Sequence, residues 1–188
     1  YPTIQHRPGV VLQSDDLALP YKENKIRMFP QSASLLHQDY GRLLYVGIMR
    51  RDPFYVLHVL FSFRASSVLQ FLNMMDSKIS SETGYAMFHS APTLSNLLYH
   101  QEILESHEVR LRDIIEIIRR RGSPDWPRLL NTEEHQISEK SAEKLERDYG
   151  QLLHCVQSLQ KRCERGMRIV LGKASIKEAE LALSHSRR

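Results

Sequence analysis

Two histidines offer the chain's most obvious chance of metal chemistry. His100 and His107 are seven residues apart, and Glu108 follows the second of them. On a helix this spacing places both imidazoles on one face but about 10 Å apart, which is too far to bind one zinc ion together. We therefore interpret them as solvated polar residues opposite a leucine stripe.

The two cysteines, Cys155 and Cys163, are the next candidates for chemistry. Eight residues along a helix separate two side chains by about 12 Å, beyond disulfide reach within that helix. We interpret them as small residues of a packed helix face. The absence of a disulfide framework in the sequence favours a reducing compartment.

Motifs typical of enzymes do not occur in the sequence. It contains no Gly-rich phosphate loop, no HExxH, no CxxC and no Gly-x-Ser-x-Gly. We expect a protein that is not an enzyme. A net charge of +4 is too small to indicate a nucleic-acid partner, and we expect none.

The basic triplet Arg119–Arg121 has two interpretations. It could bind an anion, or it could complement the negative end of a helix dipole just before Gly122 and Pro124. We favour the second, because these residues are typical of a helix terminus.

The elements that must position these residues are helical. The pattern predicts a mainly α protein: an antiparallel bundle of about three long helices, with a very long C-terminal helix and a short irregular, partly extended N-terminal segment. Asp52 and Pro53 are typical of a helix start, and this helix is expected to end near Lys78. A second helix should run from Pro92 to Arg121. The apolar stripe expected on the first helix is Leu57, Phe61, Ala65, Val68, Leu72, Met75 and Ile79. The stripe expected on the second is Leu94, Leu97, Leu104, Leu111, Ile114, Ile115 and Ile118.

We expect residues 1–50 to be the irregular segment, in which short strands at 10–12, 26–29 and 43–48 or a short helix at 33–39 fit the pattern equally well. Residues 51–138 are expected to form the helical hairpin, and residues 139–188 the long helix.

The long helix is predicted by an apolar row at alternating steps of three and four, the heptad pattern of a packed helix seam. Its members are Ala142, Leu145, Tyr149, Leu152, Val156, Leu159 and Cys163. Less regular apolar positions follow at Met167, Val170, Ala174 and Leu181. No proline interrupts the segment, so one helix of about 70 Å is expected, longer than its neighbours can cover.

The second half of this helix is basic, with Lys161, Arg162, Arg165, Arg168, Lys173, Lys177, Arg187 and Arg188. Cations suit a helix close to an anionic membrane surface, and they suit an ordinary solvated face equally well. The chain has no run of 18 apolar residues, so we expect no membrane span within it.

One segment resembles a known family. Residues 51–57, Arg-Asp-Pro-Phe-Tyr-Val-Leu, and residues 63–79, Phe-Arg-Ala-Ser-Ser-Val-Leu-Gln-Phe-Leu-Asn-Met-Met-Asp-Ser-Lys-Ile, are similar to the helix preceding the stalk in fungal CorA-like magnesium-transporter proteins. The helical patterning of residues 40–188 follows the same order. The resemblance implies a cytoplasmic helical domain whose last helix is a stalk leading to a membrane span beyond Arg188, in a homo-oligomer that is commonly a pentamer.

The resemblance also implies Mg²⁺ as the transported or regulatory ion, bound by carboxylates where stalks meet. The candidate metal residues on the long helix are Asp148, Glu164, Glu178 and Glu180; each could instead pair with a nearby Lys or Arg. The family's Gly-Met-Asn signature is absent, and Gly166-Met167-Arg168 is not a version of it. The alternative is a helical protein–protein interaction module of a membrane-anchored protein, without ion transport.

Overall fold

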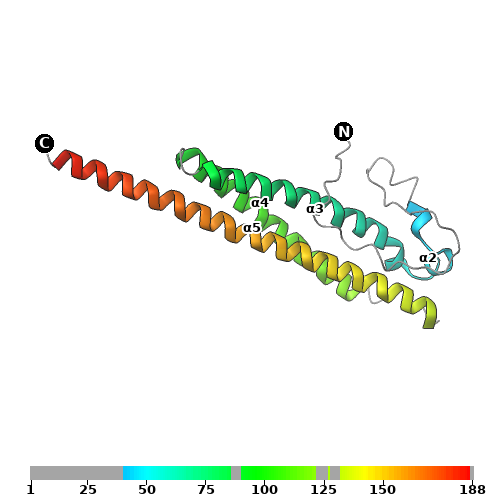
Figure 1. Ribbon diagram of the computed structural model, residues 1–188. Helices are drawn as coiled ribbons and strands as arrows, with labels where there is room; N and C mark the ends of the chain where they lie inside the picture. Colours follow the sequence, from blue (N-terminus) through cyan, green and yellow to red (C-terminus); the bar gives the residue numbers. More distant parts are fainter. Residues whose placement is uncertain (1–39, 86–89, 122–126, 128–131, 187–188) are drawn as a thin grey trace. The chain divides into compact units, whose positions relative to one another are not determined.

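The computed structural model describes residues 40–85, 90–121, 127 and 132–186. These residues form a 3-10 turn, η1 (Tyr40–Leu43), and four α-helices: α2 (Val46–Met49), α3 (Pro53–Tyr85), α4 (Ser90–Arg120) and α5 (Thr132–Ser186) (Figure 1). No strand occurs among them, so the prediction of a mainly α protein is confirmed. Residues 1–39, and most of residues 122–131 between α4 and α5, lie outside the described residues.

Helix α3 begins where the sequence predicted. Pro53 is its first residue, and the carboxylate Oδ1 of Asp52 accepts a hydrogen bond of 3.0 Å from the backbone N–H of Tyr55. This is an N-cap contact, which satisfies one of the amide groups left without a partner at a helix start.

The structure differs from the prediction at two helix ends and in one short segment. Helix α5 begins at Thr132 rather than 139, and its first turn contains Glu133 and Glu134, which suit the positive end of a helix dipole. Helix α3 continues past Lys78 to Tyr85. Residues 43–48, where a short strand fitted the pattern, contain the end of η1 and the start of α2 instead. Ile48 of α2 is fully buried.

The chain divides into two compact units, each built from segments that are distant in the sequence. Residues up to Arg64 and from Arg121 to Asp148 form the first unit; Ala65–Arg120 and Tyr149–Arg188 form the second. The first unit has a small core of Leu44, Ile48, Tyr55 and Val59, against which Ile137 of α5 packs.

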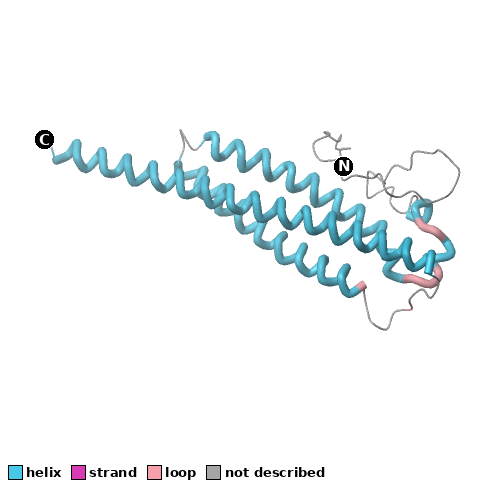
Figure 2. The backbone as a smooth tube through the Cα atoms, turned by 60° about the horizontal axis from the view of Figure 1, so that its bottom comes forward, coloured by secondary structure: helices cyan, strands magenta, loops and turns pink. Residues whose placement is uncertain are grey.

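In the second unit, the later part of α3, all of α4 and the later part of α5 pack as three helices (Figure 2). Helix α4 is antiparallel to α3 and to α5: Gly166 lies beside Leu97, and Gln157 contacts Glu108 further along α4. The predicted stripe on α4 is largely confirmed, since Leu97, Leu104, Leu111, Ile115 and Ile118 are buried.

The heptad row on α5 is confirmed in full. All seven of its members, from Ala142 to Cys163, are at most 6% exposed. The stripe predicted for α3 holds mainly in the second unit, where Ala65, Leu72, Met75 and Ile79 are buried and Val68 is half-buried. In the first unit the predicted Leu57 and Phe61 are half-buried, and Tyr55 and Val59 are buried instead.

Candidate functional site

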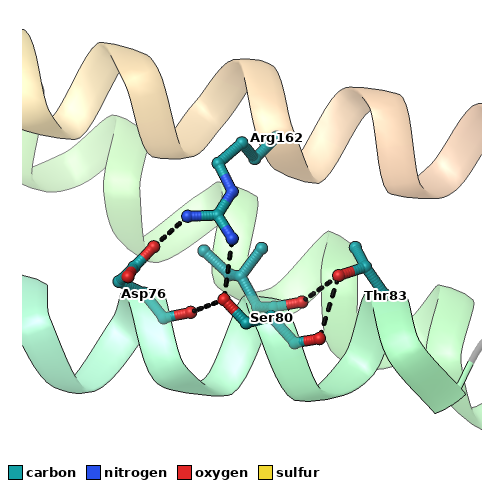
Figure 3. A network of polar contacts seen from close by, with 5 residues as sticks. Asp76, Ser80, Thr83 and Arg162 are labelled. Atoms are coloured by element: carbon teal, nitrogen blue, oxygen red, sulfur yellow. Dashed lines mark hydrogen bonds and ion pairs between the residues drawn. The ribbon is translucent and has the colours of Figure 1, made fainter.

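Arg162 links α5 to α3 in the second unit (Figure 3). One of its guanidinium nitrogens pairs with the carboxylate of Asp76, and another donates a hydrogen bond of 2.7 Å to Ser80 Oγ. Ser80 Oγ in turn donates to the carbonyl of Asp76. The side chains of Arg162 and Asp76 are 38% and 52% exposed. An exposed pair of this kind sets the register of two helices more than it adds stability.

Glu108 forms the corresponding link between α4 and α5. Gln157 Nε2 and Gln160 Nε2 each donate to its carboxylate at 3.0 Å, and Arg112 donates to it at 2.7 Å. The hydrogen bond from Gln157, followed by those from Arg112 and Gln160, lowers the pKa of Glu108 to about 2. Glu108 is therefore a charged structural contact that accepts three hydrogen bonds from side chains.

Polar contacts also join α5 to its neighbours in the first unit. Ser138 Oγ donates to the second carboxylate oxygen of Asp52, the residue that caps α3. Arg121 donates to both carboxylate oxygens of Glu139, at 2.8 and 2.5 Å. Arg121 adopts the left-handed conformation, with φ of 52°, directly after α4 ends. The helix therefore ends on an arginine at the position where a glycine is usual.

His100 and His107 are partly buried against neighbouring side chains, so the interpretation that they are solvated was wrong. The ring of His107 stacks on Phe71 with centroids 4.5 Å apart, and its Nδ1 donates to the carbonyl of Ile103. Both ring nitrogens of His100 are buried and have no hydrogen-bond partner among the described residues. His58 is also buried, and desolvation lowers its pKa. None of these rings shares a metal-binding group with other described residues.

Both cysteines are free thiols, as expected of residues on one helix. Cys163 is fully buried and burial raises its pKa to about 11, while burial also raises the pKa of Cys155. A thiol with a raised pKa carries little thiolate at neutral pH and is a poor nucleophile. The two side chains therefore serve packing.

The predicted metal candidates do not meet within one chain. Asp148 is nearly buried, and desolvation raises the pKa of its carboxyl. Glu164 pairs with Arg168 at 3.5 Å, as helical spacing allows. Glu178 and Glu180 are exposed near the end of α5. Within the described part of the chain, no group of three or more His, Cys, Asp or Glu residues could hold a metal ion.

The end of α5 is exposed and yet carries large apolar side chains. Packing on α3 and α4 reaches Gly166 and Val170, and from Leu171 to Ser186 every residue is exposed except the intermediate Lys173. Figures 1 and 2 show this end of α5 running on past the last residues of α3 and the first residues of α4. At 1.5 Å per residue the projecting part is about 24 Å long. It nevertheless carries large apolar side chains: Leu171, Ile176, Leu181 and Leu183.

An unpredicted row of exposed apolar residues begins just before this projecting part and continues along it. Ile169, Ile176 and Leu183 are spaced by seven residues and are 46%, 62% and 61% exposed. The stripe predicted from the sequence at Met167, Val170, Ala174 and Leu181 lies on the side of α5 that faces the other helices, although Ala174 and Leu181 are themselves exposed. The seven-residue spacing was visible in the sequence, but only the structure shows that this row has no intrachain partner among the described residues.

One described helix meets the length and composition of a membrane span, so composition alone does not exclude one, and the absence of a span within the chain stays a prediction. Within Pro53–Gly84 an 18-residue window has a mean hydropathy of 1.3, and 28% of it is buried. Core helices of soluble proteins have the same composition. Helix α3 supplies Tyr55 and Val59 to one core and Leu72 and Ile79 to the other, so the observation is weak evidence for a span.

No protein-family model matches this chain, and neither a curated protein nor a solved structure is significantly similar to it.

Proposed function

We propose that this chain is the helical region of a CorA-like divalent-cation transporter, in which α5 is a stalk on the cytoplasmic side of a membrane. The observation that carries the proposal is the projecting end of α5, which runs on past the helices that cover the rest of it. The resemblance of residues 51–79 supports the family, and the basic residues near this end suit an anionic membrane surface.

In this proposal Mg²⁺ binds between copies of the stalk. Magnesium prefers oxygen ligands and keeps several of its waters, so single carboxylates from several chains are suitable partners. Glu178 and Glu180 are the best placed of the predicted candidates, because both are exposed on the projecting part. Asp148 is less suitable, since its carboxyl is nearly buried within its own chain.

The test uses the complete gene product in cells that lack their own magnesium uptake. Restored growth at low Mg²⁺, lost on replacing Glu178 and Glu180 by Gln, is the expected result. Glu116→Gln is the matched control, because Glu116 pairs with Arg120 on α4, away from the projecting end. A product that reaches the membrane and transports no divalent cation would contradict the proposal.

A helical interaction module without ion transport is the second candidate. It is favoured by the exposed apolar row on α5 and by the lack of a metal-binding group among the described residues. The two candidates differ in how association depends on the ion. A module should associate equally with Mg²⁺ or with a chelator present, whereas a regulatory stalk should associate more strongly with Mg²⁺; light scattering of the chain distinguishes them.

A further inference from the structure

The row on the end of α5 alternates large and small residues in a regular way. Large residues occupy one heptad position, at Ile169, Ile176 and Leu183; small ones occupy the other, at Gly172, Ala179 and Ser186. All six are exposed, and a side-chain carbon added at Gly172 would meet nothing within 4 Å. We call these six residues the exposed seam.

The exposed seam is not a continuation of the intrachain packing. Val170 and Gly166 contact the other helices of the second unit, and the exposed seam is turned from them by about 130° round the helix. Leu181 and Ala174 lie on the intrachain side. The exposed seam can therefore bind another helix while α5 stays packed on α3 and α4.

The alternation of large and small residues favours one relative orientation, parallel or antiparallel, when the exposed seams of two chains pair. In a parallel pair, like positions meet: Ile176 faces Ile176, and Ala179 faces Ala179. Large layers would then hold the helices apart and leave voids at the small layers, and voids cost free energy. In an antiparallel pair each large residue meets a small one, because Ile176 faces Ala179 of the second copy and Gly172 faces its Leu183. Each layer then has a similar volume, and the helices can pack closely.

The charges beside the exposed seam favour the same orientation. Lys173 and Glu180 flank it at equivalent heptad positions. Antiparallel pairing places Lys173 of each copy near Glu180 of the other, so the twofold symmetry forms this pair twice. A parallel pair would instead place Arg168 beside Lys173 of the second copy, and like charges at such positions oppose pairing.

We propose that a second copy of this chain docks antiparallel on the exposed seam through a twofold axis between Lys177 and Glu178. The inference rests on the second candidate function, self-association through α5, and involves no ion. The overlap of about 26 Å is short for a protein interface, so we expect micromolar affinity. It differs from a membrane stalk, whose copies run parallel.

Cysteine cross-linking tests the orientation. The native cysteines are first replaced by Cys155→Ser and Cys163→Ala; one protein then receives Gly172→Cys and another Leu183→Cys. After mixing under reducing conditions and oxidation, the antiparallel pair predicts that nearly all disulfide-linked dimers join one protein of each kind. Residues 172 and 183 are about 16 Å apart along a helix, beyond disulfide reach, so neither protein should cross-link with itself.

Two results would overturn the inference. Cross-linking of each protein with itself would indicate parallel helices and would leave the transporter stalk as the better account. A monomer without cross-links would exclude self-association through this end. Because both Gly172→Cys and Leu183→Cys alter the exposed seam, a second pair, Ser175→Cys with Ala182→Cys and a short bismaleimide, leaves all six seam residues in place. The antiparallel pair offsets residue 175 of one copy from residue 182 of the other by about 3 Å along the helix, against about 7.5 Å for 175 with 175 and about 13.5 Å for 182 with 182, so the mixed product should form faster than either self-linked product.

Discussion

Gln160 of α5 donates a hydrogen bond of 3.0 Å to the carboxylate of Glu108 on α4, one turn of α5 beyond the matching contact from Gln157. Glu108 is 19% exposed, so most of the hydrogen bonds that its carboxylate would accept from water come instead from these two neutral amides and Arg112. Hydrogen bonds to a charged acceptor are worth more than neutral ones. This carboxylate is therefore a main polar contact between the two helices.

Glu108→Gln is expected to destabilise the protein by about 1–2 kcal/mol at pH 7, because the charge that draws three donors is removed. The effect should depend on pH. Since the pKa of Glu108 is lowered to about 2, its contribution is complete above the usual value of 4.5 and is lost as pH falls towards 2. Urea unfolding at pH 7, 5, 4 and 3 measures it.

The control is Glu116→Gln, which removes only a surface pair with Arg120 and should change stability by less than about 0.5 kcal/mol. A difference between wild type and Glu108→Gln that stays constant down to pH 3 would show that the charge of Glu108 does not stabilise the folded state.

Two glycines of α5 should respond in opposite ways to substitution. A Cβ at Gly166 would lie 2.9 Å from a Thr83 carbon and 3.0 Å from a Leu97 carbon, whereas one at Gly150 would meet nothing within 4 Å. Gly166→Leu should destabilise by about 1–3 kcal/mol through overpacking, and Gly150→Ala should stabilise by about 0.5–1 kcal/mol through helix propensity. Thermal unfolding checks both, and a stabilised Gly166→Leu variant would refute the close packing of α5 at this point.

Arg121 combines an unfavourable backbone conformation with a favourable ion pair. Replacing it by Ala or by Gly removes the contact with Glu139 in both variants, but only Ala keeps a Cβ at a φ of 52°. We expect Arg121→Ala to be less stable than Arg121→Gly by about 1 kcal/mol. Equal stabilities in denaturant unfolding would mean that the left-handed conformation is not retained.

The sequence predicted best where one periodic pattern decided the packing. Leu145, Leu152 and Val156 are buried as expected, because only one face of α5 there is apolar. On α3 apolar residues surround most of the helix, so the pattern could not distinguish Leu57 from Tyr55 as the buried position. The start of α5 at Thr132 was missed because the first turn is polar and precedes the apolar row.

The polar contacts could not be predicted from the sequence. Asp52 and Ser138 are 86 residues apart, as are Asp76 and Arg162, so their meeting depends on the register between helices and not on any local pattern. The exposed seam had a visible spacing, but a heptad row does not say whether its partner lies in the same chain. The carboxylates Asp148, Glu164, Glu178 and Glu180 were chosen by family resemblance, and metal binding by them stays a prediction.

The central claim is that the projecting end of α5 is an assembly surface. Sedimentation equilibrium of the chain over a range of micromolar concentrations tests it, with Ile176→Asp in the exposed seam and Leu171→Asp on another exposed face as the matched control. We predict a reversible dimer that is retained with Leu171→Asp and reduced to monomer by Ile176→Asp. A wild-type chain that stays monomeric at every concentration, or a dimer unaffected by Ile176→Asp, would contradict the claim.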